Sequence, residues 1–226
     1  MGEKLIPSSL ALTRARKKGA KLVKFDIYPE KTALLIIDMM NALLKPGGAV
    51  EIPSGRELVP RLNKLISVCR EKGILIIFTK HAHRATGRDM GLYTEFSPTK
   101  SIVIEGTSDV EIYDKMERQK DDIVVVKRAF SAFFGTDLDL ILRINEINTL
   151  IISGLAAHSS CEATARDARH RNYRVIFLSD GTATYDQFRD MGWGAMPGDE
   201  VRRVVLTLMA LRNAEVLSVE EVLRRI

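Results

Sequence analysis

Short apolar runs alternate along the chain with segments in which apolar side chains recur at helical spacing. Leu58, Leu62, Leu65 and Cys69 show the helical pattern, three or four residues apart. The short runs are typical of strands that are buried on both faces of a parallel sheet. We predict strands at 33–38, 74–79, 123–126, 149–154 and 174–180, and helices at 57–71, 138–144, 160–171 and 199–212.

The C-terminal part of the chain completes this pattern. Residues 215–217 predict a sixth strand at an edge of the sheet. Ser218 and Glu221 have the spacing of a capping box, which begins a terminal helix. Buried strands that alternate with helices form βαβ units, a parallel sheet and right-handed crossovers. The prediction is therefore an α/β fold: three αβα layers around a six-stranded, mainly parallel, Rossmann-like sheet.

The chain has 226 residues, enough for one such domain with a sizeable core. We place this domain at 31–226. Residues 1–30 show no clear period and predict an arm that lies on a neighbouring subunit. The connection 80–122 is long enough to indicate a functional role, and we expect a short helix within it at 110–116.

Composition and charge exclude several classes of protein. The chain is 46% hydrophobic and 28% charged, with a net charge of +5, but its basic residues are dispersed and no aromatic residues alternate with them. We therefore expect no nucleic-acid partner. No apolar run approaches the length of a membrane span, and no signal peptide is visible, so we expect no membrane partner. Two cysteines, Cys69 and Cys161, indicate a reducing cytoplasm rather than a disulfide framework.

Polar residues follow the ends of three predicted strands, where parallel sheets bind ligands. Asp38 ends the first strand, Lys127 follows the third, and a turn from Gly154 to Ser160 follows the fourth. The turn after the first strand lacks the Gly-x-Gly-x-x-Gly pattern of dinucleotide sites, and we expect no cofactor. These three features predict a functional site at one edge of the sheet.

The stretch 154–168 reads Gly-Leu-Ala-Ala-His-Ser-Ser-Cys-Glu-Ala-Thr-Ala-Arg-Asp-Ala. It resembles the nucleophile turn of the isochorismatase-like cysteine hydrolases, which runs Gly-x-x-Thr-x-x-Cys and, after three residues, Thr-Ala-Arg-Asp-Ala. A gap-free match puts Ser160, not Cys161, at the position of the catalytic cysteine. The resemblance extends from about Thr32 to Met209, is closest to the biuret and N-carbamoylsarcosine amidohydrolase branch, and implies that family's fold.

Three interpretations of this position remain open. Ser160 is a Cys→Ser change that keeps the site and suppresses turnover; or Cys161 is the nucleophile; or the protein is a natural serine hydrolase or an inactive binder. Against Cys161, one residue along a helix rotates a side chain by about 100°. Cys161 would then point into helix packing, where cysteine is usually a small buried hydrophobe.

The resemblance also assigns roles to Asp38 and Lys127. From its position alone, Asp38 could simply cap the following helix, and a lysine after a strand is usually just solvated. The family places a catalytic base at Asp38 and a cation paired with it at Lys127, which would stabilise developing negative charge. Backbone N–H groups of Ala156 and Ser160 would form the oxyanion hole, and the resemblance implies a cis peptide bond between Leu155 and Ala156.

His81 and His83 could share one face of a strand and hold a metal. Nicotinamidases of the superfamily hold a metal with an Asp-x-His pair and a further histidine, but His81 replaces the aspartate and no third histidine follows nearby. We therefore expect no metal. The candidates for substrate binding are Asn41, Tyr93, Arg128, Phe133, Phe134 and His158.

The sequence thus predicts an amidohydrolase that cleaves a C–N bond of a small amide or ureide, such as biuret or an N-carbamoyl compound. The alternatives are a metal-assisted, nicotinamidase-like amidase and a catalytically inactive small-molecule binding protein. We expect a small-molecule substrate as partner and a homo-oligomer, either a dimer or a tetramer. The exact substrate, the oligomeric state and the pathway do not follow from the sequence.

Overall fold

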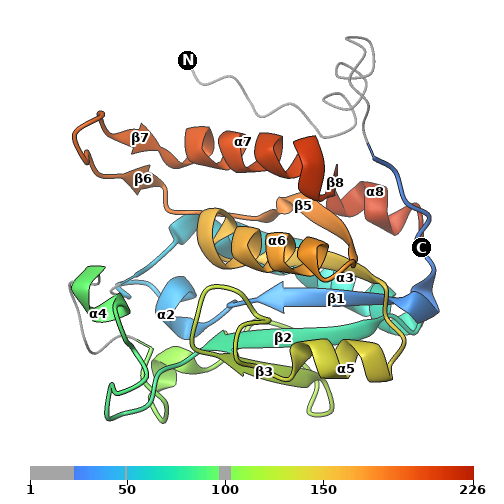
Figure 1. Cartoon of the computed structure of the whole chain (residues 1–226), viewed down its shortest axis with the longest axis horizontal. Coiled ribbons are helices and arrows are strands. Elements are labelled where there is room, and N and C mark those ends of the chain that lie inside the picture. Colours follow the sequence, from blue (N-terminus) through green and yellow to red (C-terminus); the bar gives the residue numbers. More distant parts are fainter. Residues whose placement is uncertain (1–22, 49, 97–102) are drawn as a thin grey trace.

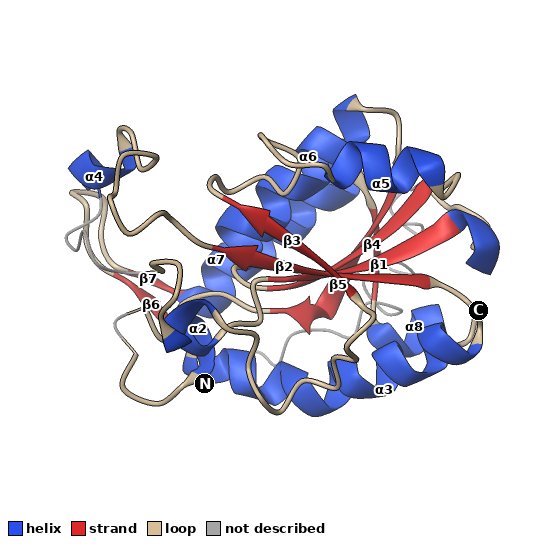
Figure 2. Cartoon of the chain, turned by 90° about the horizontal axis from the view of Figure 1, so that it is seen from below, coloured by secondary structure: helices blue, strands red, loops and turns tan. Residues whose placement is uncertain are grey.

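The computed structural model describes residues 23–48, 50–96 and 103–226. Residues 1–22 of the expected N-terminal arm lie outside this part. Six strands form one parallel sheet in the order β3-β2-β1-β4-β5-β8 (Figures 1 and 2). Their bounds are Thr32–Ile37 (β1), Leu75–His81 (β2), Ile123–Lys127 (β3), Thr149–Gly154 (β4), Arg174–Thr182 (β5) and Glu215–Leu217 (β8).

Helices cover both faces of this sheet, as Figure 2 shows. The described helices are Asn41–Leu44 (α2), Leu58–Glu71 (α3), Tyr93–Phe96 (α4), Leu138–Ile144 (α5), Glu162–His170 (α6), Gly198–Leu208 (α7) and Val219–Leu223 (α8). Among the described residues, no helix is both long and apolar enough to cross a membrane. The predicted α/β class and its three layers are confirmed.

The side-chain alternation of the strands divides the interior into two cores. Along β1, Leu34 and Ile36 pack on the side of α3 and α8. Leu35 and Ile37 pack on the opposite side, against α5, α6 and α7. Burial on both faces explains why the strands appear in the sequence as unbroken apolar runs rather than as alternating ones.

Several local predictions need correction. Residues 110–116 do not form a helix; a short 3-10 turn, Ser108–Val110, stands at the start of this stretch. The helix expected at 160–171 begins as a π-helical turn, Ala157–Cys161, and continues as α6. Two short antiparallel strands were not predicted, Gln187–Phe188 (β6) and Met196–Pro197 (β7). They project beyond the carboxyl ends of the parallel strands, on the same side of the molecule as α4 (Figure 1).

Gly154, the last residue of β4, lies unusually close to β1. It pairs with Ile37, and its φ is +104°. A Cβ atom built on Gly154 would lie 2.1 Å from the carbonyl oxygen of Ile37, which no backbone could accommodate without shifting. Glycine is therefore needed here for space as well as for backbone conformation. This close approach brings the turn after β4 next to Asp38.

We expect Gly154→Ala to lower the free energy of unfolding by more than about 3 kcal/mol, because strain and backbone overlap add. Gly73→Ala is the matched control. Gly73 also has a positive φ, +74°, but open space surrounds its Cβ position, so about 1 kcal/mol is expected. Urea unfolding of both variants measures the difference, and equal losses would contradict the role of the close approach.

Candidate active site

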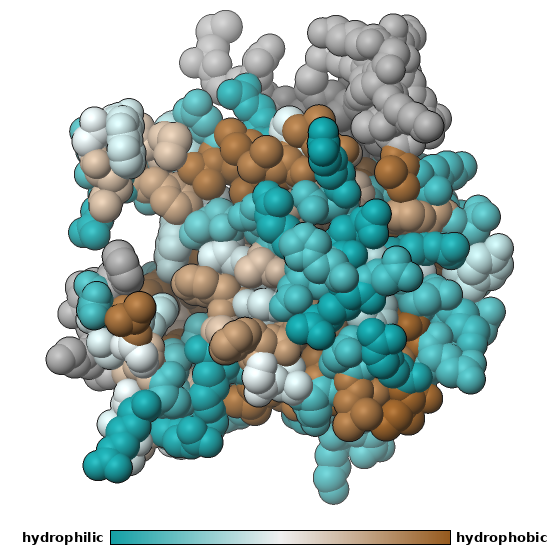
Figure 3. Space-filling view, in the orientation of Figure 1, coloured by the Kyte–Doolittle hydropathy of each residue, from teal (hydrophilic) through white to brown (hydrophobic). Residues whose placement is uncertain are grey.

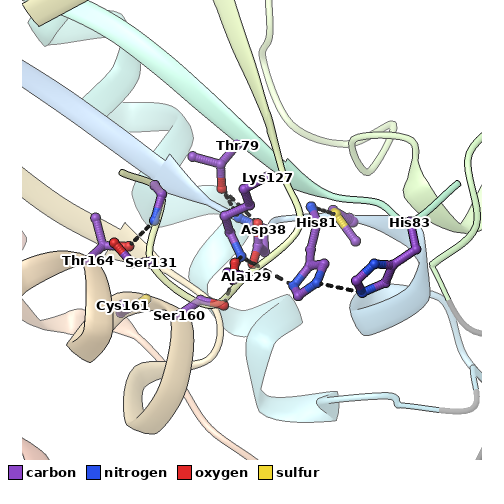
Figure 4. Close-up of polar contacts among 12 residues, drawn as sticks. Asp38, Thr79, His81, His83, Lys127, Ala129, Ser131, Ser160, Cys161 and Thr164 are labelled. Carbon is purple, nitrogen blue, oxygen red and sulfur yellow. Dashed lines mark hydrogen bonds and ion pairs between the residues drawn. The ribbon is translucent and has the colours of Figure 1, made fainter. Parts of the chain in front are cut away.

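The site lies where four neighbouring strands of the sheet end. β3, β2, β1 and β4 are adjacent, and each contributes a residue at or just after its carboxyl end (Figure 4). Lys127 ends β3, His81 ends β2, and Asp38 follows β1. The turn after β4 supplies Ser160. Residues that are up to 122 positions apart in the sequence thus meet at one edge of the sheet.

Asp38 is held in place from β2. It is 2% exposed, and its backbone has a positive φ of 48° directly after the strand. The Thr79 hydroxyl donates a hydrogen bond of 2.7 Å to Oδ1 of Asp38, and the Asp38 N–H donates one of 3.1 Å to the same hydroxyl oxygen. These bonds leave Oδ2 of Asp38 directed toward Lys127.

The Lys127 side chain starts at the end of β3 and reaches across β2 to this carboxylate, which follows β1. Val125 faces the core beside α5 and α6, and Lys127, two residues further on, shares this face. Its side chain is fully buried, and Nζ lies 2.7 Å from Oδ2 of Asp38. The same Nζ lies 3.1 Å from the Ala129 carbonyl oxygen, 3.1 Å from Oγ of Ser160 and 3.3 Å from Nδ1 of His81. The ammonium group therefore joins the carboxylate to position 160.

Ser160 and Cys161 point to different surroundings. Oγ of Ser160 accepts a hydrogen bond from Lys127, whereas Sγ of Cys161 faces the Ser153 carbonyl oxygen at 3.8 Å. Cys161 belongs to the core beside α5, α6 and α7, and burial raises the pKa of its thiol well above the usual value. The expectation that Asp38, Lys127 and Ser160 converge is confirmed, and Cys161 has the packing role that its helical position predicts.

The peptide bond between Leu155 and Ala156 is cis, as expected. The Ala156 carbonyl accepts hydrogen bonds from the N–H groups of Ser159 and Cys161, and the Ala157 N–H donates to the Ala183 carbonyl. Ser160 lies in the first turn of the helical segment, where N–H groups are generally unpaired and the dipole is positive. The turn thus presents backbone donors of the kind that the proposed oxyanion hole requires, beside Ser160.

His81 and His83 lie on the other side of Lys127. Their Nε2 atoms are 3.1 Å apart, and both rings are buried. Burial and the nearby Lys127 ammonium lower the pKa of His81 to about 3, and burial lowers the pKa of His83. Both rings are therefore neutral at pH 7. No group of three or more His, Cys, Asp or Glu side chains suited to a metal occurs within the described ranges.

Aromatic side chains surround the site on two sides. The Tyr93 ring lies 5.4 Å from His83 and 6.3 Å from Phe130. On the other side, His158 packs against Tyr185 at 5.5 Å and Phe188 at 4.8 Å, and its Nδ1 is hydrogen-bonded to the Thr184 hydroxyl. Figure 3 shows the surface hollowed between α4 and the β6-β7 hairpin. Tyr93 and His158 are therefore well placed among the predicted substrate contacts.

The other predicted contacts have different surroundings. Phe133 is a core residue whose ring stacks on Tyr173, and its assignment to the substrate site is corrected. Phe134 is 70% exposed. Arg128 is engaged by Asp89 and Glu105.

Asn41 is buried. Its Nδ2 donates to the Ser108 carbonyl, while its Oδ1 has no hydrogen-bond partner in the described part of the chain.

Sequence reasoning missed Thr79, Tyr185 and Phe188. Thr79 could have been found, because it precedes His81 by two residues on a strand and so shares its face. Tyr185 lies just before β6 and Phe188 within it, in a segment of the sequence with no helical or strand periodicity. Their approach to His158 depends on the tertiary path of that segment, which no local pattern indicates.

The structure thus brings a buried acid, a buried lysine and a hydroxyl at the start of a helical segment together on a three-layer α/β fold, an arrangement typical of hydrolases. The isochorismatase domain family matches residues 32–221, so the chain belongs to the isochorismatase family.

Curated relatives include a probable inactive nicotinamidase of Arabidopsis thaliana, 34% identical over 67% of this chain and 80% of the relative. An N-carbamoylsarcosine amidase of Arthrobacter is 30% identical over 66% of this chain and 58% of the relative. A ureidoacrylate amidohydrolase of Rhizobium rhizogenes is 27% identical over 76% and 83%. Among solved structures, a cysteine hydrolase from Pseudomonas syringae is 35% identical with a TM-score of 0.88, covering 91% of this chain and 96% of the other.

Thiol labelling tests the assignment of positions 160 and 161. Burial raises the pKa of Cys69 to about 12 and that of Cys161 well above its usual value, so neither thiol should react in the folded protein. We expect Ser160→Cys to add one thiol that reacts at least roughly tenfold faster at pH 7, because the Lys127 ammonium favours its thiolate.

The measurement is the rate of reaction with a chromogenic disulfide between pH 5 and 9. Adding Lys127→Met to Ser160→Cys should slow the labelling and move its onset to higher pH, since the stabilising cation is gone. Rapid labelling of Cys161 in the unaltered protein would show that Cys161, and not position 160, is the reactive position.

Proposed function

We propose that this protein has the active site of an amidohydrolase that cleaves a C–N bond of a small amide or ureide. The observation that carries the proposal is the Lys127 ammonium, which lies between the Asp38 carboxylate and Oγ of Ser160. A buried acid, a cation and a nucleophile position beside backbone donors are the groups that acyl transfer needs. The relatives named ureidoacrylate amidohydrolase and N-carbamoylsarcosine amidase support this chemistry.

The first half of the reaction acylates position 160 when a cysteine stands there. The sulfur attacks the substrate carbonyl carbon, and its proton passes to Asp38. The carbonyl electrons move to oxygen, and the N–H groups of Ala156 and residue 160 stabilise the oxyanion. As the tetrahedral intermediate collapses, the C–N bond breaks, and the departing nitrogen takes the proton from Asp38 and leaves as ammonia or an amine.

The second half releases the acyl group. Water attacks the thioester or thiocarbamate carbon while Asp38 accepts a proton from it. The C–S bond then breaks, and the sulfur recovers the proton. Lys127 remains an ammonium group throughout, stabilising the thiolate and the charge on Asp38 in turn. With a cysteine at position 160, each step thus uses only groups of the protein, the substrate and water.

Serine at position 160 keeps the ground-state contacts but weakens the nucleophile. A hydroxyl is far less acidic than a thiol and needs a stronger base for activation. In the structure the Asp38 carboxylate is paired with Lys127 and accepts a hydrogen bond from Thr79, and no further base is in contact with Oγ of Ser160 among the described residues. We therefore propose that the protein is a Cys→Ser form that binds its substrate and does not turn it over.

The proposed substrate is small and planar, of the biuret or N-carbamoyl type. The polar groups of the site are almost completely buried, so a small molecule can reach them more readily than a polymer can. Aromatic rings on both sides, Tyr93 and Tyr185 among them, suit the flat faces of a ureide. A relative named N-carbamoylsarcosine amidase supports this class.

The decisive experiment is Ser160→Cys with ammonia release measured over a panel of ureides and amides that includes biuret. We expect no measurable turnover by the unaltered protein, and a large rise in kcat for Ser160→Cys with little change in affinity, because only the transition state gains the thiolate. Adding Cys161→Ala to Ser160→Cys should leave the activity largely intact. Binding without any gain of turnover would favour an inactive binding protein.

We also propose that the protein is a cytoplasmic homo-oligomer, a dimer or a tetramer. Val204 and Leu208 of α7 and the nearby Leu211 form an exposed apolar row on one helical face. Figure 3 shows apolar residues gathered over this region. Such a patch on a soluble domain commonly marks a protein interface. Both cysteines are free, as a reducing compartment requires.

Sedimentation velocity tests the self-association. Leu208→Glu should shift the protein toward the monomer, because it places a charge in the apolar row. Leu140→Glu is the control, since Leu140 is also exposed but lies on α5, away from α7. A monomeric unaltered protein, or equal effects of the two changes, would overturn the assigned interface.

A further inference from the structure

A line of polar side chains leads from Lys127 away from Asp38 toward the surface. Nζ of Lys127 lies 3.3 Å from Nδ1 of His81, and Nε2 of His81 lies 3.1 Å from Nε2 of His83. Beyond it, Nδ1 of His83 lies 3.8 Å from Oδ2 of Asp89. Both imidazoles are neutral and buried, so each has one N–H donor and one acceptor nitrogen.

The lysine fixes the direction of every hydrogen bond along this line. An ammonium group can only donate, so Nδ1 of His81 must be an acceptor and its proton must reside on Nε2. That N–H donates to Nε2 of His83, which must therefore carry its own proton on Nδ1. The His83 Nδ1–H then faces the carboxylate of Asp89. The two rings consequently hold opposite tautomers.

Asp89 fixes the other end of the line with a negative charge. The backbone N–H of Arg84 donates to both of its carboxylate oxygens at 3.1 Å, and Nε of Arg128 lies 3.1 Å from Oδ2. A cation at one end and an anion at the other favour the same polarity through both rings. Nδ1 of His83 has no hydrogen-bond acceptor at closer range among the described residues, which leaves Asp89 as the group it faces.

Four acceptors surround the Lys127 ammonium, which has three protons. The orientation of the Lys127 ammonium group therefore depends on which neighbouring groups offer it a hydrogen-bond acceptor. We propose that His81 and His83 are positioning residues that form a relay of fixed tautomers from Lys127 to Asp89 and keep the ammonium aimed between Asp38 and position 160. The effect of this relay on catalysis rests on the proposed function; its tautomers do not.

A different arrangement of protons would give the pair a different role. If both rings carried their protons on Nδ1, the two Nε2 lone pairs would face one another, 3.1 Å apart, as in a two-nitrogen clamp for a divalent cation. That arrangement leaves Lys127 facing an N–H group rather than an acceptor. The relay and the clamp therefore require opposite tautomers at His81.

Long-range proton–nitrogen NMR of the full chain labelled with ¹⁵N-histidine distinguishes them. The sequence has four histidines, and His81→Gln, His83→Gln and the exposed His170→Gln assign the signals. We expect His81 to carry its proton on Nε2 and His83 on Nδ1, the minor tautomer of free imidazole, with neither titrating near the usual pKa of about 6.5. His81 with its proton on Nδ1, displaced signals on adding zinc alone, or ordinary titration of either ring would overturn the relay.

Catalysis gives a second readout in the Ser160→Cys protein. A Gln at position 83 can accept from His81 and donate toward Asp89, whereas a Phe fills similar space and can do neither. We expect Ser160→Cys with His83→Phe to lose kcat by roughly tenfold or more at nearly unchanged KM, and His83→Gln to retain most of it.

A packing role for His83 would give the reverse order, with Phe tolerated better than Gln, and would overturn the proposed relay. If Ser160→Cys itself has no turnover on any amide or ureide, the proposed function fails. The NMR result then still decides whether the relay exists, because it is obtained from the unaltered chain.

Discussion

The site depends on one interaction, the buried ion pair between Lys127 and Asp38. Removing two charges from water costs several kcal/mol per ion, and their attraction offsets this only with good geometry and further hydrogen bonds. The structure provides both: a distance of 2.7 Å, the Thr79 hydroxyl on the carboxylate, and carbonyl, hydroxyl and imidazole acceptors on the ammonium. Loss of either charged partner, Lys127 or Asp38, would leave an uncompensated charge in a low-dielectric interior.

The strand order makes this pair possible. Asp38 follows β1 and Lys127 ends β3, with β2 between them. The lysine side chain is long enough to reach across one strand. Lys127 lies two residues after Val125 and therefore on the same face of the sheet, the face that α5 and α6 cover. On the same face, the turn after β4 presents Ser160. The fold thus sets the distances between Asp38, Lys127 and Ser160, orients their side chains toward one another and keeps water away from them before any substrate is present.

Much of this arrangement could be predicted from the sequence because it depends on local patterns of apolar and polar residues. Unbroken apolar runs such as 149–154 identify strands, and the carboxyl ends of parallel strands must meet, so Asp38, Lys127 and Ser160 were predictable neighbours. The assignment of Phe133 failed because a buried aromatic residue has the same local pattern whether it faces a ligand or the core. The roles of Tyr185, Phe188 and Asp89 depend on how irregular segments return to the sheet, which hydrophobic periodicity does not encode.

The backbone conformation of Asp38 restricts this position independently of its chemistry. With φ at 48°, it occupies the left-handed region, which glycine, asparagine and aspartate enter far more readily than other residues. Of these three, only aspartate can take and return a proton. Most routes of sequence drift from Asp38 therefore meet a conformational barrier, and the accessible ones lead to residues without an acid. The geometry at the end of β1 narrows the evolutionary choices at this position to a few residues, among which the reaction then selects one.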